Sequence, residues 1–532
     1  MSHLNMFWSS MKREIVCMSR EQRRSLLAGL TRPKPLCIAH RGASGHRLEN
    51  TLEAFELAAR LNADMWEIDV QLTADGVCVV SHDDNLNKNA GVDVRIQDVS
   101  YERLRAYRLH NGEPVPSVRE VIQLARQTGC GLYIELKAEG SGPKVVDLLK
   151  EMNFSNVVIG SFKTSRLAEL AALHCPYPLS VLVPAGADPF SLAETGCADM
   201  IHLCWEKASD TPHELLSDEL IAKAQARQLP IVIWHEERAN EIARLMRMPV
   251  WGICSDLPEM VSAYHPHPDN PIQIVCHRGA NTIAPENTLA SAELGYRMGA
   301  ETIELDLNTT ADGQLVVIHD DTLDRTTNLN GPVCQRTLAE LSLCDAGSWF
   351  HPNYRTEEVS AFVTYLALAD RYQKSLFVEL KAANAGRVME EVAARNAWSR
   401  CFFWSFDFAS VDLIQSNYPQ ARVMRRRQDY PNLAVLLATG TPYVVEYDHL
   451  IDDLSEFAQC RASGAKVMVR FFADQLDAAV ALIGLKPDMV NIDDPFTFSR
   501  AYGIWLKSGY PGIATPCEES QSIQIAGRTQ DA

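Results

Sequence analysis

The 532-residue sequence has no excess of positive charge and no long apolar run. It carries 68 Asp and Glu residues against 50 Lys and Arg residues, a formal net charge of −18. Proteins that bind nucleic acids need clustered positive charge instead. No apolar run reaches the roughly 18 residues that a membrane-spanning helix requires. We therefore expect no nucleic-acid binding and no membrane span, whereas a small anionic substrate held by a local cation or a metal suits this composition.

The fourteen cysteines include no CxxC pair. Several of them, such as Cys37, Cys78, Cys254 and Cys276, lie inside apolar strand-like runs, which favours buried thiols in a reducing compartment over disulfides. Near the N-terminus, charged residues at 12–14 interrupt any apolar core of signal-peptide length. These features predict a cytoplasmic protein.

What the chain does contain is an internal repeat with a constant offset of 237 positions. HRGA at 40–43 recurs at 277–280, and 24 of 47 positions are identical between 40–86 and 277–323. The residues kept in both copies are mainly polar and ionisable, which indicates two copies of one catalytic domain. We expect a leader at 1–33, a first domain at 34–263, a proline-rich linker at 264–270, a second domain at 271–505 and a polar tail at 506–532.

Short β-branched runs alternate with longer helical patterns within each copy. The first copy has nine strand-like segments, at 36–40, 65–70, 77–82, 132–137, 157–162, 179–183, 200–205, 231–235 and 252–256. Helical patterns lie between them, for example at 50–61, 117–127 and 236–246. This alternation predicts a parallel sheet, and the near-continuous apolar runs fit strands that are buried on both faces. The fold class is α/β, with two tandem TIM (β/α)₈ barrels, and one late segment of the nine is expected to be irregular or extra.

Polar residues gather at the C-terminal ends of these strand-like runs, where the active sites of TIM barrels lie. Glu67 and Asp69 are two positions apart on one strand, so their side chains share a face, and Glu135 lies on the strand after next. Three such carboxylates repel one another unless a cation lies among them, and hard oxygen ligands select Mg²⁺ or Ca²⁺. Pairing with Arg41 and Lys137 is the alternative, but it leaves surplus negative charge. The second copy repeats the carboxylates as Glu304, Asp306 and Glu379.

Two histidines, His40 and His82, lie beside these carboxylates. Their ordinary pKa is close to neutral, so such a pair can act as base and acid at physiological pH. Arg41 offers a fork-shaped donor that matches phosphate oxygens, and Lys137 adds a second cation. The second copy repeats these residues as His277, His319, Arg278 and Lys381. A hard metal, two cations and an acid–base pair together favour displacement at a phosphodiester.

Other repeated residues are expected to have structural roles. Asp75-Gly76 and its counterpart at 312–313 predict a tight turn before the third strand-like segment. Glu49-Asn50-Thr51 is expected to cap the helix that follows it rather than to take part in catalysis.

The ordered set HRG, ENT, E-x-D, HDD, E-L-K, S-F and a final D-x-P resembles the glycerophosphodiester phosphodiesterase family. The resemblance implies a TIM barrel, a divalent metal and hydrolysis of small glycerophosphodiesters to glycerol 3-phosphate and an alcohol. It implies that Glu67, Asp69, Glu135, Glu304, Asp306 and Glu379 bind metal, that His40, His82, His277 and His319 exchange protons, and that Arg41, Lys137, Arg278 and Lys381 bind phosphate. It also implies that the substrate's own glycerol hydroxyl attacks phosphorus, giving a cyclic phosphate that water then opens.

The two copies differ outside these residues. The second copy has Arg325-Thr326-Thr327 where the first has Asn87-Lys88-Asn89, and Arg470 where the first has Trp234. We expect different substrate preferences, or one copy of lower activity. Two alternatives remain open: a lyase that stops at the cyclic phosphate, and a chain in which one barrel is catalytic and the other a binding or regulatory module. The sequence does not indicate the oligomeric state.

Overall fold

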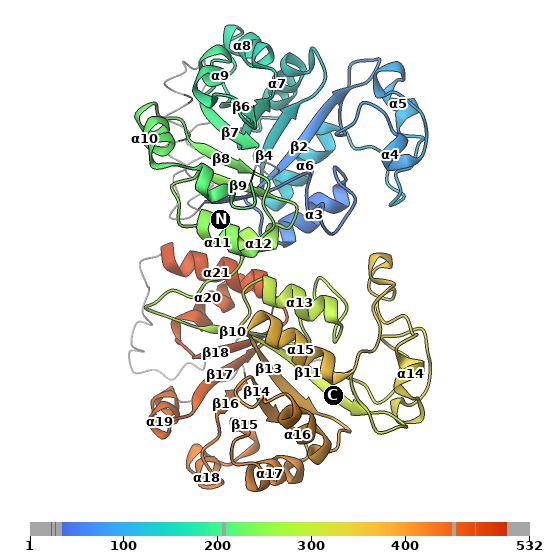
Figure 1. The fold of residues 1–532 in the computed structure, drawn as a ribbon, viewed down its shortest axis with the longest axis vertical. Helices are drawn as coiled ribbons and strands as arrows, with labels where there is room; N and C mark the ends of the chain where they lie inside the picture. The colour runs from blue at the N-terminus through green and yellow to red at the C-terminus, as the bar shows by residue number, and fades with distance from the viewer. Residues whose placement is uncertain are drawn as a thin grey trace. The chain divides into compact units, whose positions relative to one another are not determined.

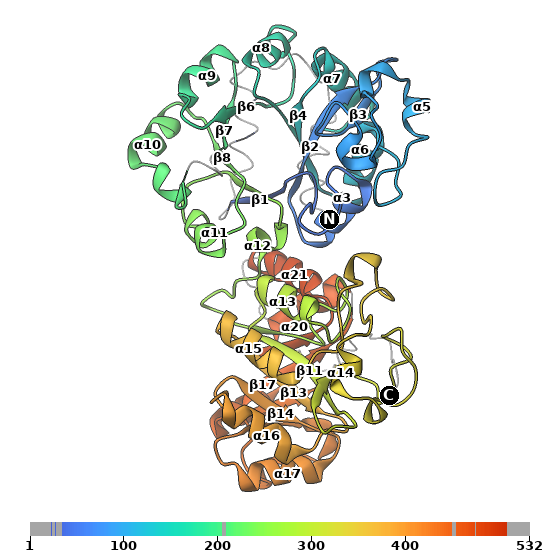
Figure 2. The same cartoon turned by 45° about the vertical axis from the view of Figure 1, so that its right-hand side comes forward.

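The computed structural model describes residues 23, 27, 35–204, 209–448, 454–473 and 475–507. The chain divides into two compact units, Met1–Ser262 and Ala263–Ala532. Each unit contains a closed barrel of parallel strands surrounded by helices (Figures 1 and 2). The prediction of two tandem TIM barrels is therefore confirmed.

The first barrel closes through eight strands in the order β1-β9-β8-β7-β6-β5-β4-β2, with β1 paired to β2. Its strands, with one extra strand β3, are β1 (Leu36–Ala39), β2 (Met65–Leu72), β3 (Cys78–Val80), β4 (Gly131–Leu136), β5 (Val157–Ser161), β6 (Leu179–Pro184), β7 (Met200–Cys204), β8 (Ile231–Trp234) and β9 (Gly252–Ser255). Its helices are α3 (Leu52–Arg60), α4 (Asn87–Ala90), α5 (Tyr101–Leu104), α6 (Val118–Thr128), α7 (Ser141–Glu151), α8 (Thr164–Ala172), α9 (Pro189–Thr195), α10 (Asp218–Ala226), α11 (Ala239–Leu245) and α12 (Pro258–Ser262).

The second barrel has the same topology, in the order β10-β18-β17-β16-β15-β14-β13-β11. Its strands, with the extra strand β12, are β10 (Gln273–Cys276), β11 (Thr302–Thr309), β12 (Leu315–Val317), β13 (Ser375–Leu380), β14 (Cys401–Trp404), β15 (Arg422–Arg426), β16 (Val444–Tyr447), β17 (Lys466–Phe471) and β18 (Met489–Ile492). Its helices are α13 (Leu289–Arg297), α14 (Leu338–Leu341), α15 (Phe362–Tyr372), α16 (Ala385–Ala394), α17 (Phe408–Asn417), α18 (Leu433–Ala438), α19 (Ser455–Ser463), α20 (Leu476–Gly484) and α21 (Pro495–Lys507).

The extra strand-like segment is an early one, so the expectation of a late irregular segment is wrong. β2 extends beyond the barrel, and Gly76, with a φ of 77°, lets the chain reverse after it. β3 then pairs antiparallel with β2, Val70 opposite Val80, outside the closed ring. Because β3 runs back along β2, its end returns to the level of Asp69, where the Ser81 amide donates to the Asp69 carbonyl. His82 therefore reaches the same mouth as residues from the parallel strands.

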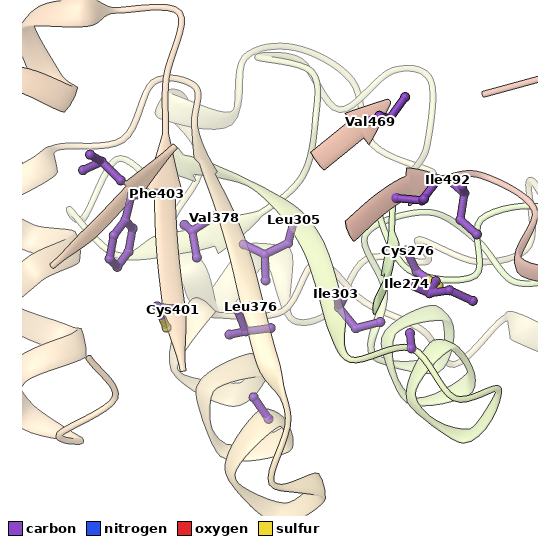
Figure 3. Packing of buried hydrophobic residues seen from close by; sticks show 14 of the residues in the cluster. Ile274, Cys276, Ile303, Leu305, Leu376, Val378, Cys401, Phe403, Val469 and Ile492 are labelled. Atoms are coloured by element: carbon purple, nitrogen blue, oxygen red, sulfur yellow. The ribbon is translucent and has the colours of Figure 1, made fainter. Parts of the chain in front are cut away.

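Alternate side chains along each strand pack into two separate apolar layers. In the second barrel Ile303, Leu305, Val378 and Phe403 belong to the layer between strands and helices (Figure 3). The intervening residues, such as Phe377, face the barrel interior. Both strand faces are thus buried, as the near-continuous apolar runs predict. Glu304 and Asp306 alternate with Ile303 and Leu305, so they point inward instead.

Local sequence explains where the helices nearest the sites begin. Thr51 accepts a hydrogen bond from the Ala54 amide at the start of α3, and Ser117 forms a capping box with Glu120 at the start of α6. None of the helices in the described part of the chain combines the length and the apolar character needed to cross a bilayer.

Candidate active sites

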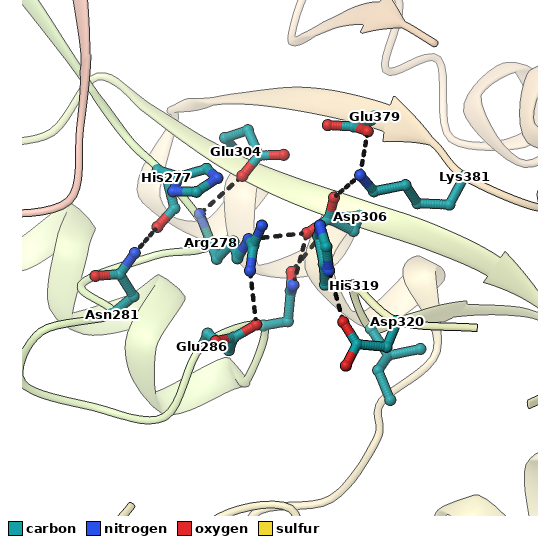
Figure 4. Close-up of polar contacts among 12 residues, drawn as sticks. His277, Arg278, Asn281, Glu286, Glu304, Asp306, His319, Asp320, Glu379 and Lys381 are labelled. Atoms are coloured by element: carbon teal, nitrogen blue, oxygen red, sulfur yellow. Dashed lines mark hydrogen bonds and ion pairs between the residues drawn. The ribbon is translucent and has the colours of Figure 1, made fainter. Parts of the chain in front are cut away.

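Three carboxylates meet at the C-terminal ends of two adjacent strands in each barrel. In the first barrel Glu67 and Asp69 lie on β2, and Asp69 stands in register with Glu135 on β4. One oxygen from each of the three side chains lies within 4.8 Å of the others, and all three residues are buried. The second barrel has the same arrangement, formed by Glu304, Asp306 and Glu379 (Figure 4).

Two cations lie among the carboxylates of the first barrel. Arg41 Nε is 3.2 Å from Asp69 Oδ2, and Lys137 Nζ is 3.2 Å from Asp69 Oδ1 and 2.9 Å from Glu135 Oε1. The ion pairs considered as the alternative to a metal are therefore present. They centre on Asp69, however, and among the described residues Glu67 receives only the Arg41 backbone amide, at 3.1 Å. The surplus negative charge expected from the sequence remains.

The second barrel repeats this arrangement of cations. Arg278 Nε is 3.4 Å from Asp306 Oδ2, and the Arg278 amide donates to Glu304 Oε2 at 2.8 Å. Lys381 contacts Glu379, and its Nζ is 3.5 Å from Asp306 Oδ1. Figure 4 shows these side chains converging from β11, β13 and the segment after β10.

The carboxylates of one cluster have opposite pKa shifts. Burial and the like charges of Asp69 and Glu135 raise the pKa of Glu67 well above its ordinary value. Burial also raises the pKa of Glu135, to about 7. Burial acts against ionisation of Asp69 too, but Lys137 and Arg41 outweigh it and lower the pKa of Asp69. Two of the three groups thus carry an electrostatic penalty that a bound cation would relieve.

The second cluster shows the same imbalance. Burial raises the pKa of Glu304 well above its ordinary range and that of Glu379 to about 7. Glu304 Oε1 is buried without a hydrogen-bond partner among the described residues. A buried carboxylate oxygen of this kind, within an all-oxygen ligand set, fits a hard divalent cation.

Each predicted histidine faces a carboxylate through Nδ1. His40 Nδ1 lies 2.6 Å from Asp256 Oδ1, and His82 Nδ1 lies 2.8 Å from Asp83 Oδ1. Such a partner fixes the orientation of the imidazole and leaves Nε2 to act on a substrate. The equivalent pairs in the second barrel are His277 with Asp493, at 2.7 Å, and His319 with Asp320, at 2.7 Å.

Burial lowers the pKa of His40, although the hydrogen bond to Asp256 acts to raise it. Burial acts to raise the pKa of Asp256, but the hydrogen bond and charge of His40, together with Ser44 and His235, outweigh burial and lower this pKa to about 2. Burial likewise lowers the pKa of His319. His40 and His319 are therefore mainly neutral at pH 7 and able to accept a proton.

Two residues assigned to a helix cap by the sequence analysis lie in the site. Thr51 does cap α3, but Asn50 Nδ2 donates to Asp69 Oδ2 at 2.8 Å, and Glu49 Oε2 accepts from Arg41 Nη1 at 2.7 Å. Arg41 and Asn50 both have a positive φ, 54° and 59°, which turns this loop toward the carboxylates. Their identity in both copies was the available signal, since a cap alone requires only the threonine. The second copy repeats these contacts through Glu286 and Asn287.

The segments that follow HDD differ in sequence between the two barrels, but in both a basic side chain contacts the glutamate of the ENT motif. In the second barrel Arg325 binds both Glu286 and Asp320, at 2.8 Å each. In the first barrel Lys88 Nζ reaches Glu49 Oε1, the equivalent of Glu286, at 2.7 Å. An open depression of about 760 Å³, whose lining includes His82, Lys88 and Lys137, borders this side of the first site.

A second aromatic or imidazole ring covers the first histidine of each barrel, a contact that the sequence does not predict. His235 stacks on His40 with ring centroids 5.0 Å apart, and its Nδ1 is 2.8 Å from Glu237 Oε1. In the second barrel Phe472 stacks on His277 at 4.3 Å. The two histidines thus have the same carboxylate partner but different neighbours on one face.

Comparisons with known proteins show which family the sequence matches. A sequence model of the glycerophosphoryl diester phosphodiesterase family matches residues 40–260 and 277–470. A glycerophosphodiester phosphodiesterase of Bacillus subtilis (strain 168) is 42% identical over 233 residues, and the alignment covers 42% of this chain and 78% of that protein. The B. subtilis protein YhdW is 39% identical over 168 residues, and the alignment covers 31% of this chain and 65% of that protein. The crystal structure of a glycerophosphodiester phosphodiesterase from Agrobacterium tumefaciens is 31% identical with a TM-score of 0.41, covering 43% of this chain and 99% of that one.

Proposed function

The chain belongs to the glycerophosphoryl diester phosphodiesterase family, and on this basis we propose that each barrel hydrolyses glycerophosphodiesters to glycerol 3-phosphate and an alcohol. The observation that carries the proposal is the repetition of one complete site. Both barrels hold three converging carboxylates, and in both of them two histidines are oriented by separate aspartates. A binding module would need no such pair of proton-transfer groups.

We assign a divalent cation, Mg²⁺ or Ca²⁺, to each carboxylate cluster. Glu67, Asp69 and Glu135 would hold it in the first barrel. These carboxylates are buried, and the raised pKa values of Glu67 and Glu135 show that their charged forms lack compensation, which such an ion would supply. When bound, the ion supplies positive charge that offsets the charge of the phosphoryl oxygens. Arg41 and Lys137 would bind the same phosphate group from the protein side.

The histidines provide the proton transfers. One of His40 and His82 takes the proton from the glycerol hydroxyl that attacks phosphorus, and the other gives a proton to the departing alcohol oxygen. The P–O bond to the alcohol breaks as the bond to the glycerol oxygen forms, which gives a cyclic phosphate. In the second step water attacks, the histidines exchange roles, and the ring opens to glycerol 3-phosphate. His277 and His319 would act in the same way in the second barrel.

Phosphorus NMR of glycerophosphocholine incubated with the full chain and Mg²⁺ or Ca²⁺ tests this assignment. We expect conversion to glycerol 3-phosphate, with no cyclic phosphate persisting once the diester is consumed. A cyclic phosphate that accumulates and never opens would show the lyase alternative to be correct.

The same assay tests the carboxylate clusters. The double variant Glu67→Gln/Glu304→Gln should lose essentially all turnover, because each cluster loses one ligand and one charge. Glu151→Gln, which removes an exposed carboxylate on α7 paired with Arg119, is the matched control and should keep full activity. Full turnover by the double variant would exclude both clusters from the reaction.

A further inference from the structure

Residues that differ between the two barrels are candidates for recognising the alcohol, the part of a glycerophosphodiester that varies from one substrate to another. This inference rests on the proposed function, in which glycerol phosphate is common to all substrates and only the alcohol varies. The carboxylates, histidines, arginine and lysine of the site are the same in both barrels and suit the common part. Differences at the barrel mouth therefore indicate how each barrel treats the alcohol.

Three inward-facing positions at the mouth of the second barrel carry charged side chains. Met424, Val444 and Met468 lie in the apolar cluster inside the barrel. Because side chains alternate along a strand, the residues two positions further on face the same interior, one level nearer the mouth. These residues are Arg426 on β15, Glu446 on β16 and Arg470 on β17.

Arg426 and Arg470 belong to a continuous series of contacts around the mouth, which we call the collar: Phe406, Arg426, Asp448, Arg470 and Phe472. The Arg426 guanidinium carbon is 5.3 Å from the Phe406 ring centroid, and its Nη2 is 3.8 Å from Asp448 Oδ2. Arg470 also contacts Asp448, and its guanidinium carbon is 5.5 Å from the Phe472 ring.

The two ends of the collar meet the catalytic centre. Lys381 Nζ, which also contacts Glu379, is 5.5 Å from the Phe406 ring centroid. At the other end Phe472 stacks on His277. A group bound over the collar is therefore next to both the phosphate-binding lysine and the proton-transfer histidine.

The first barrel has apolar residues at both arginine positions. Strands β6 and β7 of the first barrel correspond to β15 and β16 of the second. Ser180 on β6 pairs with Met200, and Met424 on β15 pairs with Val444. Leu182, two residues after Ser180, therefore corresponds to Arg426. Trp234 takes the place of Arg470 by the same register argument. Leu182 and Trp234 pack in the apolar cluster inside that barrel, together with Phe162.

Arg426 is well placed to bind an anion. Its side chain is 12% exposed, and the described residues give its guanidinium no hydrogen bond. Its nearest carboxylates, Asp448 and Asp429, are 3.8 and 3.9 Å away, which is beyond hydrogen-bond distance. Asp448 and Asp429 are thus within ion-pair distance of the guanidinium but form no hydrogen bond with it, so an incoming carboxylate or phosphate oxygen can accept one.

We propose that the collar is the alcohol subsite of the second barrel, and that its arginines select glycerophosphodiesters whose alcohol carries its own carboxylate or phosphate. The first barrel, with Leu182 and Trp234 at the same positions, prefers alcohols without such a group. The chain thus divides its substrates by the charge of the alcohol.

The test compares glycerophosphoglycolate, whose alcohol carries a carboxylate, with glycerophosphoethanol, whose alcohol is uncharged. Phosphorus NMR follows the consumption of each diester by the full chain with one barrel inactivated. The His40→Ala variant leaves only the second barrel active, and the His277→Ala variant leaves only the first. We expect a higher kcat/KM ratio, glycolate over ethanol, from the His40→Ala chain than from the His277→Ala chain.

Adding Arg426→Leu and Arg470→Trp to the His40→Ala chain should lower that ratio roughly 10- to 100-fold, the range for charge-assisted hydrogen bonds. Replacing Arg426→Leu by Arg426→Lys in this chain should restore part of the glycolate-to-ethanol ratio, because lysine keeps the positive charge. Arg422→Leu, at the opposite end of β15, is the matched control and should leave the ratio unchanged. Turnover of glycerophosphoethanol shows that each variant is folded.

Equal ratios for the two barrels, or a preference that survives loss of both arginines, would overturn the inference while leaving the proposed function intact. A His40→Ala chain that cleaves neither diester would instead refute the proposed function of the second barrel, and this inference with it.

Discussion

At the scale of single residues, neighbouring charges decide what otherwise identical carboxyl groups do. Asp69 and Glu67 are two residues apart and equally buried, yet the pKa of Asp69 is lowered and that of Glu67 is raised. The difference follows from position, because Arg41 and Lys137 both pair with Asp69. Asp69 therefore pairs with both cations, while among the described residues Glu67 accepts only the Arg41 backbone amide, so its charged form is disfavoured until a cation binds.

Glu446 allows a prediction about pH and stability away from the proposed metal ligands. Burial raises its pKa from 4.5 to about 7, although Arg470 and Arg426 act to lower it. A pKa raised by folding stabilises the folded chain fully below about pH 4.5, and this stability is lost as the pH rises toward 7. Relative to Glu446→Gln, the free energy of unfolding of the wild-type chain should fall by up to about 3 kcal/mol between pH 4.5 and 8.

Urea unfolding of both proteins at a series of pH values measures this difference. The other carboxyl groups titrate in both chains, so their contribution cancels. A difference that stays constant with pH would show that Glu446 does not titrate in this range.

At the scale of elements, the connection between β1 and α3 positions Arg41 and Asn50. Gly42 has a φ of 83°, and a Cβ there would lie 2.8 Å from the backbone carbon of Ala54 in α3. Gly42→Ala should therefore destabilise the first barrel by more than the approximately 1 kcal/mol expected from backbone strain alone.

Gly129→Ala is the matched control, because Gly129 has a φ of 80° but open space around its Cβ position. The difference between the two variants in urea unfolding isolates the contact with α3. Equal losses in the free energy of unfolding would mean that the loop at Gly42 can move away from α3 without a measurable loss of stability.

Most of the elements, and which candidate site residues come together, were predictable from the sequence, because hydrophobic periodicity indicates the strands and the internal repeat indicates the shared polar residues. The apolar runs of β2 and β4 place Glu67, Asp69 and Glu135 at strand ends, and the structure brings them together. The extra strand was misplaced, since an apolar run such as that of β3 does not reveal whether it pairs parallel or antiparallel. The contacts of Asp256 with His40 and of Phe472 with His277 join distant segments, so no local pattern predicts them.

At the scale of the whole molecule, duplication has kept the centre of the site and changed its surroundings. Metal-stripped full chain should therefore bind two divalent cations, one in each barrel, in isothermal titration calorimetry with Mg²⁺ or Ca²⁺. Glu67→Gln and Glu304→Gln should each remove one of them, because each variant disrupts one carboxylate cluster. Unchanged stoichiometry in either variant would place the metal elsewhere.

The most direct test of two working catalytic centres is the release of glycerol 3-phosphate from glycerophosphocholine and related diesters by His40→Ala, by His277→Ala and by the double variant. We predict that each single variant keeps the activity of the other barrel and that the double variant loses essentially all turnover. A double variant with full activity would contradict the site assignment, and a single variant with none would contradict the claim that both barrels work.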